Sequence, residues 1–450
     1  MERNLTTGSV WKTVVRFSLP FLLSYFLQTL YGLADLFIIG QFNGVEATTA
    51  VSNGSQVMHM CTVMIVGLAM GTTVMIGQAV GAKKNELASR AIGNTIVLFL
   101  CVSVALAVVL SIIVRPIVGV MSTPAEAVEG TISYLRICFI GIPLITAYNV
   151  ISAVFRGMGD SRSPMYFIAV ACVANIVLDY VFIGAMGMGP RGAAFGTVLG
   201  QTISVIVALI YVLVRKTGIT MKRSDFRPRR ETMGGLLKVG VPIALQDGFI
   251  QISFLIITIF ANMRGLNDAA AIGVVEKIIS IPFLIPSSML ATVSALSAQN
   301  VGAGLYDRAK KTLRYAIFIA VGWGILVTVV MEFSADWLVA LFTSSKEVVR
   351  LGGQYLRGYV FDCIFAGIHF SCSGYFSGVG RSGLSFMHNV ISILGVRIPF
   401  AYLASRMFAS TLMPMGLATA AGSLLSVIIC AILFVWLERK RKVHNQFRRD

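Results

Sequence analysis

The stretch QAVGAKKNELASRA at residues 78–91 returns as QNVGAGLYDRAKKT at residues 299–312, so that Gln299 follows Gln78 by 221 positions. Two other motifs keep the same offset. They are Tyr134-Leu135-Arg136, repeated as Tyr355-Leu356-Arg357, and Phe155, Gly157 and Gly159, repeated as Phe376, Gly378 and Gly380. A single offset shared by separated motifs indicates that the chain is a tandem duplication of one unit.

The composition indicates what this unit is made of. Of 450 residues, 56% are hydrophobic and 13% are charged, and the mean hydropathy is +0.81. Soluble domains carry about 25% charged residues. We therefore expect an all-α membrane protein with twelve transmembrane helices, each formed by an apolar run of about 20 residues. The runs lie near residues 14–38, 50–79, 91–114, 131–155, 163–186, 192–214, 239–262, 269–299, 313–333, 351–376, 384–405 and 416–437.

The positions of Lys and Arg predict the orientation, because cytoplasmic loops collect these residues. One side of the predicted membrane carries most of them. This side holds Arg3, Lys12, Arg16, Lys83, Lys84, Arg90, Arg156, Arg162, the segment 215–238, Arg308, Lys310, Lys311, Arg314, Arg381 and the segment 439–449. We predict a multi-pass protein of the cell inner (plasma) membrane with both termini in the cytoplasm. The formal net charge of +17 then reflects topology, and we expect no nucleic-acid partner.

The even number of spans in each copy predicts the symmetry. Six spans return the chain to its starting side, so the two six-helix bundles have the same orientation, related by a pseudo-two-fold axis along the membrane normal. We predict an N-lobe at residues 1–214, a cytoplasmic interlobe linker at 215–238, a C-lobe at 239–438 and a basic cytoplasmic tail at 439–450.

Several local motifs, together with the duplicated six-helix unit, resemble one transporter family. They are Leu19-Pro20 in the first span, LADLFIIGQF around Asp35, and the Q-x-V-G-A motifs at Gln78 and Gln299. The chain resembles the multidrug and toxic compound extrusion (MATE) family over essentially its full length. The resemblance implies two six-helix lobes in a V shape, alternating access, and export of mostly cationic organic compounds in exchange for sodium or protons. We expect small-molecule substrates, contact with membrane lipid, a monomer, and no cofactor besides the coupling ion.

Acids at membrane depth are the first candidates for the coupling site, because burying them there is costly. Asp35 lies 21 residues into the first span and Asp179 lies 16 residues into the fifth, so both reach a similar height. Asn175 precedes Asp179 by one helical turn and shares its face, and Thr197 lies in the first turns of the sixth span. Four oxygen-bearing side chains at one level predict a site for a hard cation such as sodium.

The resemblance implies the same four positions, since one MATE subgroup uses them as its N-lobe cation site. A proton shared by the two carboxylates would serve equally well, so the sequence leaves sodium and proton both open. A third interpretation is structural: Asp35 and Asp179 would each hydrogen-bond a neighbouring helix, as polar residues in membrane bundles often do.

The substrate path is marked by polar or amphipathic residues within the spans. In the first copy these are Gln28, Tyr31 and Asn149, and in the second copy Gln246, Asp247, Gln251 and Asp362. Aromatic and Met side chains suit a broad cationic substrate. With 28 Phe and 20 Met in the chain, most such side chains pack the core or face lipid.

The second copy does not repeat the acids of the first, so the predicted cation site is confined to the N-lobe. At the repeat offsets Asp35 meets Ile257, and Asp179 meets Phe400. The second copy carries a different set of titratable residues within its spans. These are Asp247, Glu276, Lys277, Asp362, His369, His388 and Arg397.

Two expectations concern this second set. The resemblance implies coupling acids in helices seven and ten of some MATE subgroups, and Asp247 and Asp362 lie on those helices. We also expect Lys277 to neutralise Glu276 or to reach Asp362, since internal ion pairs of this kind commonly stabilise membrane bundles.

The leading hypothesis is a secondary active exporter in which cation binding at Asp35 and Asp179 repacks the first span at Pro20, which lacks a backbone donor. The alternative is a flippase of lipid-linked oligosaccharides from the same superfamily, although such proteins need a cavity rich in basic residues. A channel remains open. An enzyme and an ATP-driven pump are disfavoured, because the sequence shows neither a catalytic constellation nor a G-x-x-x-x-G-K-[ST] motif.

Overall fold

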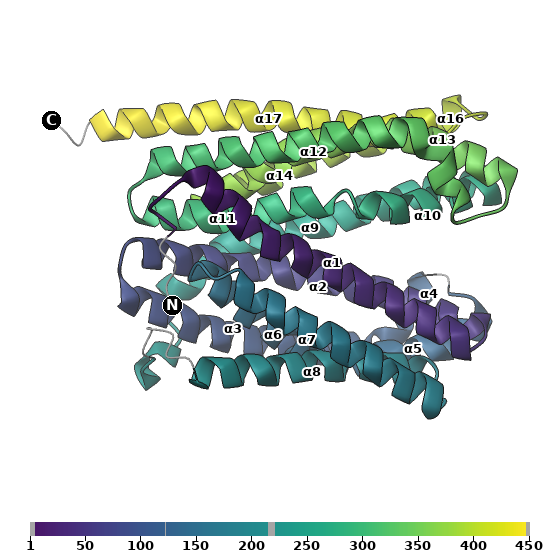
Figure 1. The fold of residues 1–450 in the computed structure, drawn as a ribbon, viewed down its shortest axis with the longest axis horizontal. Helices are drawn as coiled ribbons and strands as arrows, with labels where there is room; N and C mark the ends of the chain where they lie inside the picture. The colour runs from purple at the N-terminus through teal and green to yellow at the C-terminus, as the bar shows by residue number, and fades with distance from the viewer. Residues whose placement is uncertain (1–4, 122, 215–220, 447–450) are drawn as a thin grey trace. The chain divides into compact units, whose positions relative to one another are not determined.

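The computed structural model describes residues 5–121, 123–214 and 221–446, with side chains up to residue 441. Within these ranges every regular element is a helix and none is a strand (Figure 1). The all-α prediction is therefore confirmed. Parts of the predicted linker and tail, residues 215–220 and 447–450, lie outside the described residues.

Residue contacts divide the chain into two compact units. Unit 1 comprises residues 1–244 and 298–306, and unit 2 comprises residues 245–297 and 307–450. Unit 1 thus continues through the predicted linker into the start of α9 and includes the end of α11. The lobe boundaries drawn from the sequence stay a prediction, because contacts group residues by packing and the repeat groups them by ancestry.

Unit 1 is built from eight α-helices, two short helices of other types, and parts of α9 and α11. They are α1 (Val10–Phe42), α2 (Val45–Gly81), α3 (Asn85–Ile112), α4 (Val114–Val120), α5 (Ala125–Ile140), α6 (Ile142–Gly157), α7 (Arg162–Asp179), the π-helix η1 (Tyr180–Ala185), α8 (Pro190–Val214) and the 3-10 helix η2 (Arg223–Phe226).

Unit 2 contains the remaining helices. They are α9 (Arg230–Arg264), α10 (Leu266–Ser280), α11 (Leu284–Gly302), α12 (Tyr306–Ala340), α13 (Lys346–Tyr359), α14 (Asp362–Gly378), α15 (Ser382–Ser392), the π-helix η3 (Ile393–Arg397), α16 (Ile398–Met407) and α17 (Met413–Gln446).

Among the described residues, nine helical segments are long and apolar enough to cross a membrane, and two bent helix pairs raise the total to eleven. These pairs are α5 with α6, bent by 51°, and α10 with α11, bent by 47°. The one remaining predicted span, 351–376, is the tenth in chain order and falls on α13 and α14. These helices have 14 and 17 residues, and α13 is rich in polar side chains such as Gln354 and Arg357, so neither helix qualifies as a span by itself. This number of apolar helices identifies the chain as a multi-pass membrane protein.

The bent spans differ from the continuous helices that hydropathy predicts, and proline explains the difference. Pro143 stands in the first turn of α6, and Pro282 lies between α10 and α11. Proline lacks a backbone donor and clashes with the preceding turn. The carbonyl of the buried Pro282 accepts a 3.0 Å hydrogen bond from Trp323 Nε1, which pairs one backbone oxygen at the break within unit 2.

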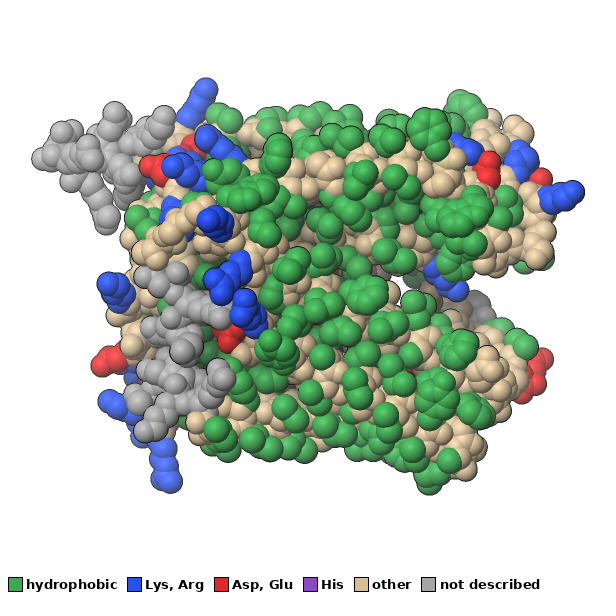
Figure 2. Space-filling view, viewed as in Figure 1, with side chains coloured by type: hydrophobic (Ala, Val, Ile, Leu, Met, Phe, Trp, Pro, Cys, Tyr) green, Lys and Arg blue, Asp and Glu red, His purple; other side chains and the backbone are tan. Residues whose placement is uncertain are grey.

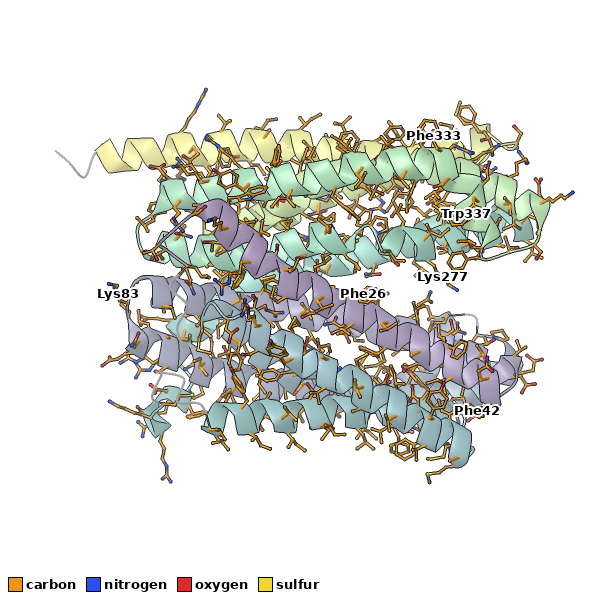
Figure 3. The ribbon with its side chains drawn as sticks, in the orientation of Figure 1. Phe26, Phe42, Lys83, Lys277, Phe333 and Trp337 are labelled. Atoms are coloured by element: carbon orange, nitrogen blue, oxygen red, sulfur yellow. The ribbon has the colours of Figure 1, made fainter. Side chains whose placement is uncertain are left out.

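The outer flanks of the helices are apolar (Figure 2). Phe26 projects from α1 and Phe333 and Trp337 project from α12 (Figure 3); Phe333 is 87% exposed. Large exposed apolar side chains would be unfavourable in water but match hydrocarbon. In unit 1, Lys83 and Phe42 lie at opposite ends of the bundle (Figure 3), which agrees with charge restricted to the helix ends.

The two copies of the Q-x-V-G-A motif meet each other inside unit 1. A Cβ atom on Gly81 would lie 2.0 Å from the carbonyl oxygen of Gln299, and a Cβ on Gly302 would lie 2.1 Å from that of Gln78. Gln299 Nε2 also donates a 2.9 Å hydrogen bond to the carbonyl of Gly157. We call this reciprocal contact the motif clasp. The absence of a side chain at both glycines permits it.

Candidate functional site

Three helices bring the predicted cation-coupling residues together. Asp35 lies on α1, Asn175 and Asp179 lie on α7, and Thr197 lies on α8. Helix α7 packs against both α1 and α8. Because Asn175 and Asp179 are one turn apart, they share the face of α7 that meets the other two helices. The structure thus gathers residues that are up to 162 positions apart in sequence.

The contacts among these four residues converge on Asp35. Thr197 Oγ1 donates a 3.3 Å hydrogen bond to Asp35 Oδ2. The side chains of Asn175 and Asp179 also interact with the Asp35 carboxyl group. These approaches are close but not aligned as strict hydrogen bonds, since Asp35 Oδ1 and all four oxygen and nitrogen atoms of the other two side chains lack such a partner among the described residues.

Burial makes this arrangement costly without a bound positive charge. Asp35 is 3% exposed and Asp179 is fully buried. A buried carboxylate needs a partner, because its transfer from water is strongly unfavourable. Two of them in contact repel each other as well. The cluster therefore has the chemistry of a site that takes up a cation or a proton.

Two glycines on α8 create the space for these acids. A Cβ atom on Gly196 would lie 1.9 Å from Asp179 Oδ1, and one on Gly200 would lie 3.1 Å from the Cβ of Asn175. Sequence reasoning missed both residues. Their spacing of one helical turn beside Thr197 is a signal that could have pointed to a close helix contact.

The donor set fits an alkali cation better than a transition metal. No group of three or more His, Cys, Asp or Glu side chains suited to a metal ion occurs among the described residues. Two carboxylates, an amide oxygen and a hydroxyl are hard oxygen donors. Asp35, Asn175, Asp179 and Thr197 could hold sodium, and the two carboxylates alone could share a proton.

The predicted substrate residues fall into the two units. In unit 1, Tyr31 lies near Asp35, Gln28 is half-buried, and the buried Asn149 donates to the carbonyl of Ile145 in its own helix. In unit 2, Gln246 is buried beside the half-buried Asp247, Gln251 is half-buried, and Asp362 is buried. Their role as substrate ligands stays a prediction.

The prediction that Lys277 neutralises Glu276 or reaches Asp362 is wrong. Lys277 is exposed (Figure 3), whereas Glu276 and Asp362 both interact electrostatically with Arg397. The reason is the direction in which each side chain points from the helix axis. Neighbouring residues on a helix point about 100° apart, so Glu276 and Lys277 face different directions, and only Glu276 faces the interior.

A π-helix follows or includes a buried charged residue in the fifth span of each copy. In unit 1, η1 starts directly after Asp179, and in unit 2, η3 ends at Arg397. Such irregular segments rotate the side chains around them and are frequent at functional sites. Neither π-helix was predicted from hydropathy or residue spacing.

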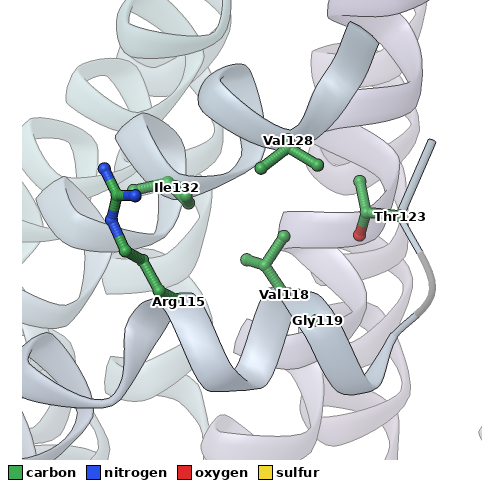
Figure 4. A pocket seen from close by; sticks show the side chains of 6 residues that line it. All are labelled: Arg115, Val118, Gly119, Thr123, Val128 and Ile132. Carbon is green, nitrogen blue, oxygen red and sulfur yellow. The ribbon is translucent and has the colours of Figure 1, made fainter. Parts of the chain in front are cut away.

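A separate cavity of about 190 Å³ lies between α4 and α5 of unit 1 and is lined by Arg115, Val118, Gly119, Thr123, Val128 and Ile132 (Figure 4). None of the four cation-site residues lines it. Its walls are mainly aliphatic, with Arg115 at one side (Figure 4).

Comparison with known protein families gives independent evidence for the duplication. A family model described as MatE matches residues 20–181 and again residues 242–403. The two matches start at Pro20 and Pro242 and together cover most of the chain. They confirm the tandem duplication inferred from the repeated motifs.

The chain is also similar to individual proteins of the same type. It is 29% identical to the probable multidrug resistance protein YoeA of Bacillus subtilis (strain 168), over 88% of this chain and 87% of YoeA. It is 29% identical to the probable multidrug resistance protein YpnP of the same strain, over 89% and 90%. A solved structure described as a crystal structure of MATE in complex with MaL6 matches with a TM-score of 0.89 at 25% identity, over 98% of each chain.

Proposed function

Because the chain belongs to the MatE family of membrane transporters, we propose that it is a secondary active exporter that moves organic compounds, mostly cationic, out of the cell in exchange for sodium or protons. The names of the relatives YoeA and YpnP support drug-like substrates. The observation that carries the proposal is the meeting of Asp35, Asn175, Asp179 and Thr197 inside unit 1.

The charge of this cluster links ion binding to conformation. With both carboxylates ionised and nothing bound, repulsion and desolvation favour separating α1 from α7. A bound cation or proton favours the packed arrangement. An ion that binds one arrangement more tightly shifts the equilibrium toward it, and this preference drives the change between outward and inward access.

Helix α1 contains a position suited to such a change. Pro20 cannot donate to the preceding turn, and Ser24 Oγ donates a 2.7 Å hydrogen bond to the carbonyl of Pro20. Proline and a serine bonded back to its own helix both favour bending. We place the flexible point of α1 here, about four turns from Asp35.

Sodium and proton place different demands on the site. Sodium would use the oxygens of Asn175 and Thr197 as well as the two carboxylates. A proton needs only Asp35 and Asp179. Replacing Asn175 or Thr197 should therefore impair coupling to sodium but not to protons. Replacing Asp35 or Asp179 should impair coupling to either ion.

We also propose that both termini lie in the cytoplasm and that the protein acts as a monomer. The concentration of Lys and Arg in one set of loops supports cytoplasmic termini. The substrates are small molecules, and a monomer contains the complete site, since all four residues come from one chain.

Transport into inside-out membrane vesicles tests the function. Vesicles are loaded with sodium, or acidified inside, and accumulation of a fluorescent organic cation is followed. An exporter accumulates the cation only while the ion gradient lasts, and the effective gradient names the ion. A channel equilibrates the cation without accumulating it. A flippase accumulates none but translocates a labelled lipid-linked oligosaccharide.

A further inference from the structure

Unit 2 contains a cavity of about 70 Å³ that the proposed cation exchange does not use. Its lining includes Phe254 from α9, Asp362 and His369 from α14, Arg397 from η3, and Ser426 from α17. The cavity is roughly half the size of an engineered cavity of about 150 Å³ that admits benzene. It therefore suits a small polar group and is too small for a whole drug-sized molecule.

Arg397 is the unusual member of this lining. It is 7% exposed, and its guanidinium group stacks on Phe254 with 4.5 Å between Cζ and the ring centroid. Its Nε and Nη2 atoms have no hydrogen-bond partner within the described part of the chain. A buried guanidinium with free donors is costly at membrane depth, and Nε and Nη2 are spaced to bind a carboxylate through two parallel hydrogen bonds.

The backbone holds Arg397 in this position. Gly422 on α17 allows close approach, because a Cβ atom there would lie 2.9 Å from the Cβ of Arg397. The hydroxyl of Ser392 donates to the carbonyl of Gly422, which fastens the start of η3 to the same helix. These two contacts hold the backbone of Arg397, and the stacking on Phe254 orients its guanidinium.

Asp362 supplies the opposite charge in the same cavity. It is 2% exposed, and its Oδ1 atom has no hydrogen-bond partner among the described residues. The hydroxyl of Ser423 interacts with its carboxyl group. Arg397 and Asp362 attract each other across the cavity, yet the atoms that face it remain without aligned partners.

The two histidines near the cavity differ in their hydrogen bonding. His388 is held on both sides, with Ser373 Oγ 2.8 Å from Nε2 and Ser426 Oγ 2.6 Å from Nδ1. His369 is buried beside it, and its Nδ1 has no hydrogen-bond partner in the described ranges. His388 is therefore part of the scaffold, while His369 offers a further polar atom to a bound group.

We propose that this cavity binds the zwitterionic head group of a transported amphiphile, with the carboxylate on Arg397 and the ammonium on Asp362. The inference rests on the proposed export function and names a substrate class for it: solutes that carry an ammonium and a carboxylate on neighbouring atoms and an apolar remainder. One ligand with both charges can meet the Nε and Nη2 donors of Arg397 and the Oδ1 acceptor of Asp362 at once. A simple cation has no acceptor for the guanidinium donors, which Glu276 and Asp362 balance in charge but do not meet with aligned hydrogen bonds.

Binding to the wild-type protein tests the proposal without any variant. The purified full chain is titrated with Nε-dansyl-lysine, which has a free ammonium and carboxylate, with its methyl ester, and with its Nα-acetyl derivative. We expect the zwitterion to bind at least about tenfold more tightly than either derivative, because each derivative loses one charge-assisted pair. Equal binding of the three probes, as in a cavity that holds only water, or no binding of the zwitterion, overturns the proposal.

A matched pair of arginine variants assigns the preference to this cavity. Arg397→Gln should remove the preference for the zwitterion over its methyl ester. Arg406→Gln, on the same span but exposed and over the ring of Tyr402, should keep it. A preference that survives Arg397→Gln, or that is lost equally in both variants, contradicts the assignment. If Arg397→Gln does not fold, the wild-type titration decides.

Gradient-driven uptake of a fluorescent organic cation, measured in the same preparation, separates this inference from the proposed function. Uptake without discrimination among the dansyl probes overturns only the zwitterion site. Discrimination without gradient-driven uptake supports the site and overturns the exporter.

Discussion

Thr197 on α8 donates a 3.3 Å hydrogen bond to Asp35 on α1. This contact joins the sixth predicted span to the first, at the acid on which Asn175 and Asp179 also converge. Ion binding at Asp35 therefore acts on three helices at once. A local change in charge can in this way alter the packing of the whole unit.

Thr197→Val distinguishes sodium from proton coupling. Valine keeps the shape of threonine but removes the hydroxyl, which is worth about 0.5–1.5 kcal/mol. If sodium is the coupling ion, the sodium concentration for half-maximal export should rise by roughly 2- to 10-fold. Thr202→Val is the matched control, because within the described part of the chain the Thr202 hydroxyl bonds only the carbonyl of Val198 in its own helix. An unchanged sodium dependence in Thr197→Val removes Thr197 from the ion site.

Gly196→Ala tests the space that holds Asp179. The added methyl would lie 1.9 Å from Asp179 Oδ1, so the carboxyl group must move. We expect export to fall by at least about tenfold, in line with the 1–3 kcal/mol typical of overpacking, while the protein still inserts. Gly32→Ala on α1, where a Cβ meets open space, should keep wild-type export. Full activity of Gly196→Ala would mean that Asp179 need not stay where the structure has it.

Hydropathy and repeats predicted much of this molecule. Twelve apolar runs and the offset between Gln78 and Gln299 were enough for the helical class and the duplication. Counting residues also placed Asp35 and Asp179 at one height, and the structure brings them together. Depth along a helix follows from residue number alone, which is why these predictions succeeded.

Rotation about the helix axis and local irregularity did not follow from the sequence. Lys277 was expected to pair with Glu276 or Asp362, but these acids interact electrostatically with Arg397 instead, because the choice of partner depends on the direction in which each helix face points. The bends in α5–α6 and α10–α11 and the π-helices η1 and η3 change that direction. Gly196 was missed because its role is to leave space for Asp179 of the neighbouring helix, and such a role depends on which helices are in contact.

The motif clasp should be sensitive to any side chain. Gly81→Ala and Gly302→Ala would each place a methyl within 2.1 Å of a backbone carbonyl oxygen, and a backbone atom cannot rotate away. We expect each to destabilise the protein by about 1–3 kcal/mol, seen as a lower apparent unfolding temperature. Gly322→Ala, in α12 with open space around its Cβ, should leave stability equal or slightly higher. Equal stability of all three variants would show that the clasp does not form.

Arg264 fastens one end of unit 2. Its guanidinium donates to Asp268 Oδ2 at 2.7 Å and to the backbone carbonyls of Ser405, Phe408, Ala409 and Thr411. Arg264→Ala removes these five hydrogen bonds, and we expect the free energy of unfolding to fall by about 2–3 kcal/mol, measured by thermal unfolding.

Arg350→Ala is the control for Arg264→Ala, since Arg350 forms an exposed ion pair with Glu347, and such pairs contribute little. A smaller effect for Arg264→Ala than for Arg350→Ala would contradict the fastening role.

The most direct test is ion-driven export by Asp35→Asn compared with Asp307→Asn in inside-out vesicles. Both replacements remove one negative charge, but Asp35 belongs to the four-residue cluster of unit 1, whereas the Asp307 side chain lies outside it and is 91% exposed. We expect Asp35→Asn to insert normally and to accumulate no fluorescent cation under a sodium or proton gradient, while Asp307→Asn still responds to the gradient. Gradient-driven accumulation at the wild-type level in Asp35→Asn would contradict the proposed coupling site.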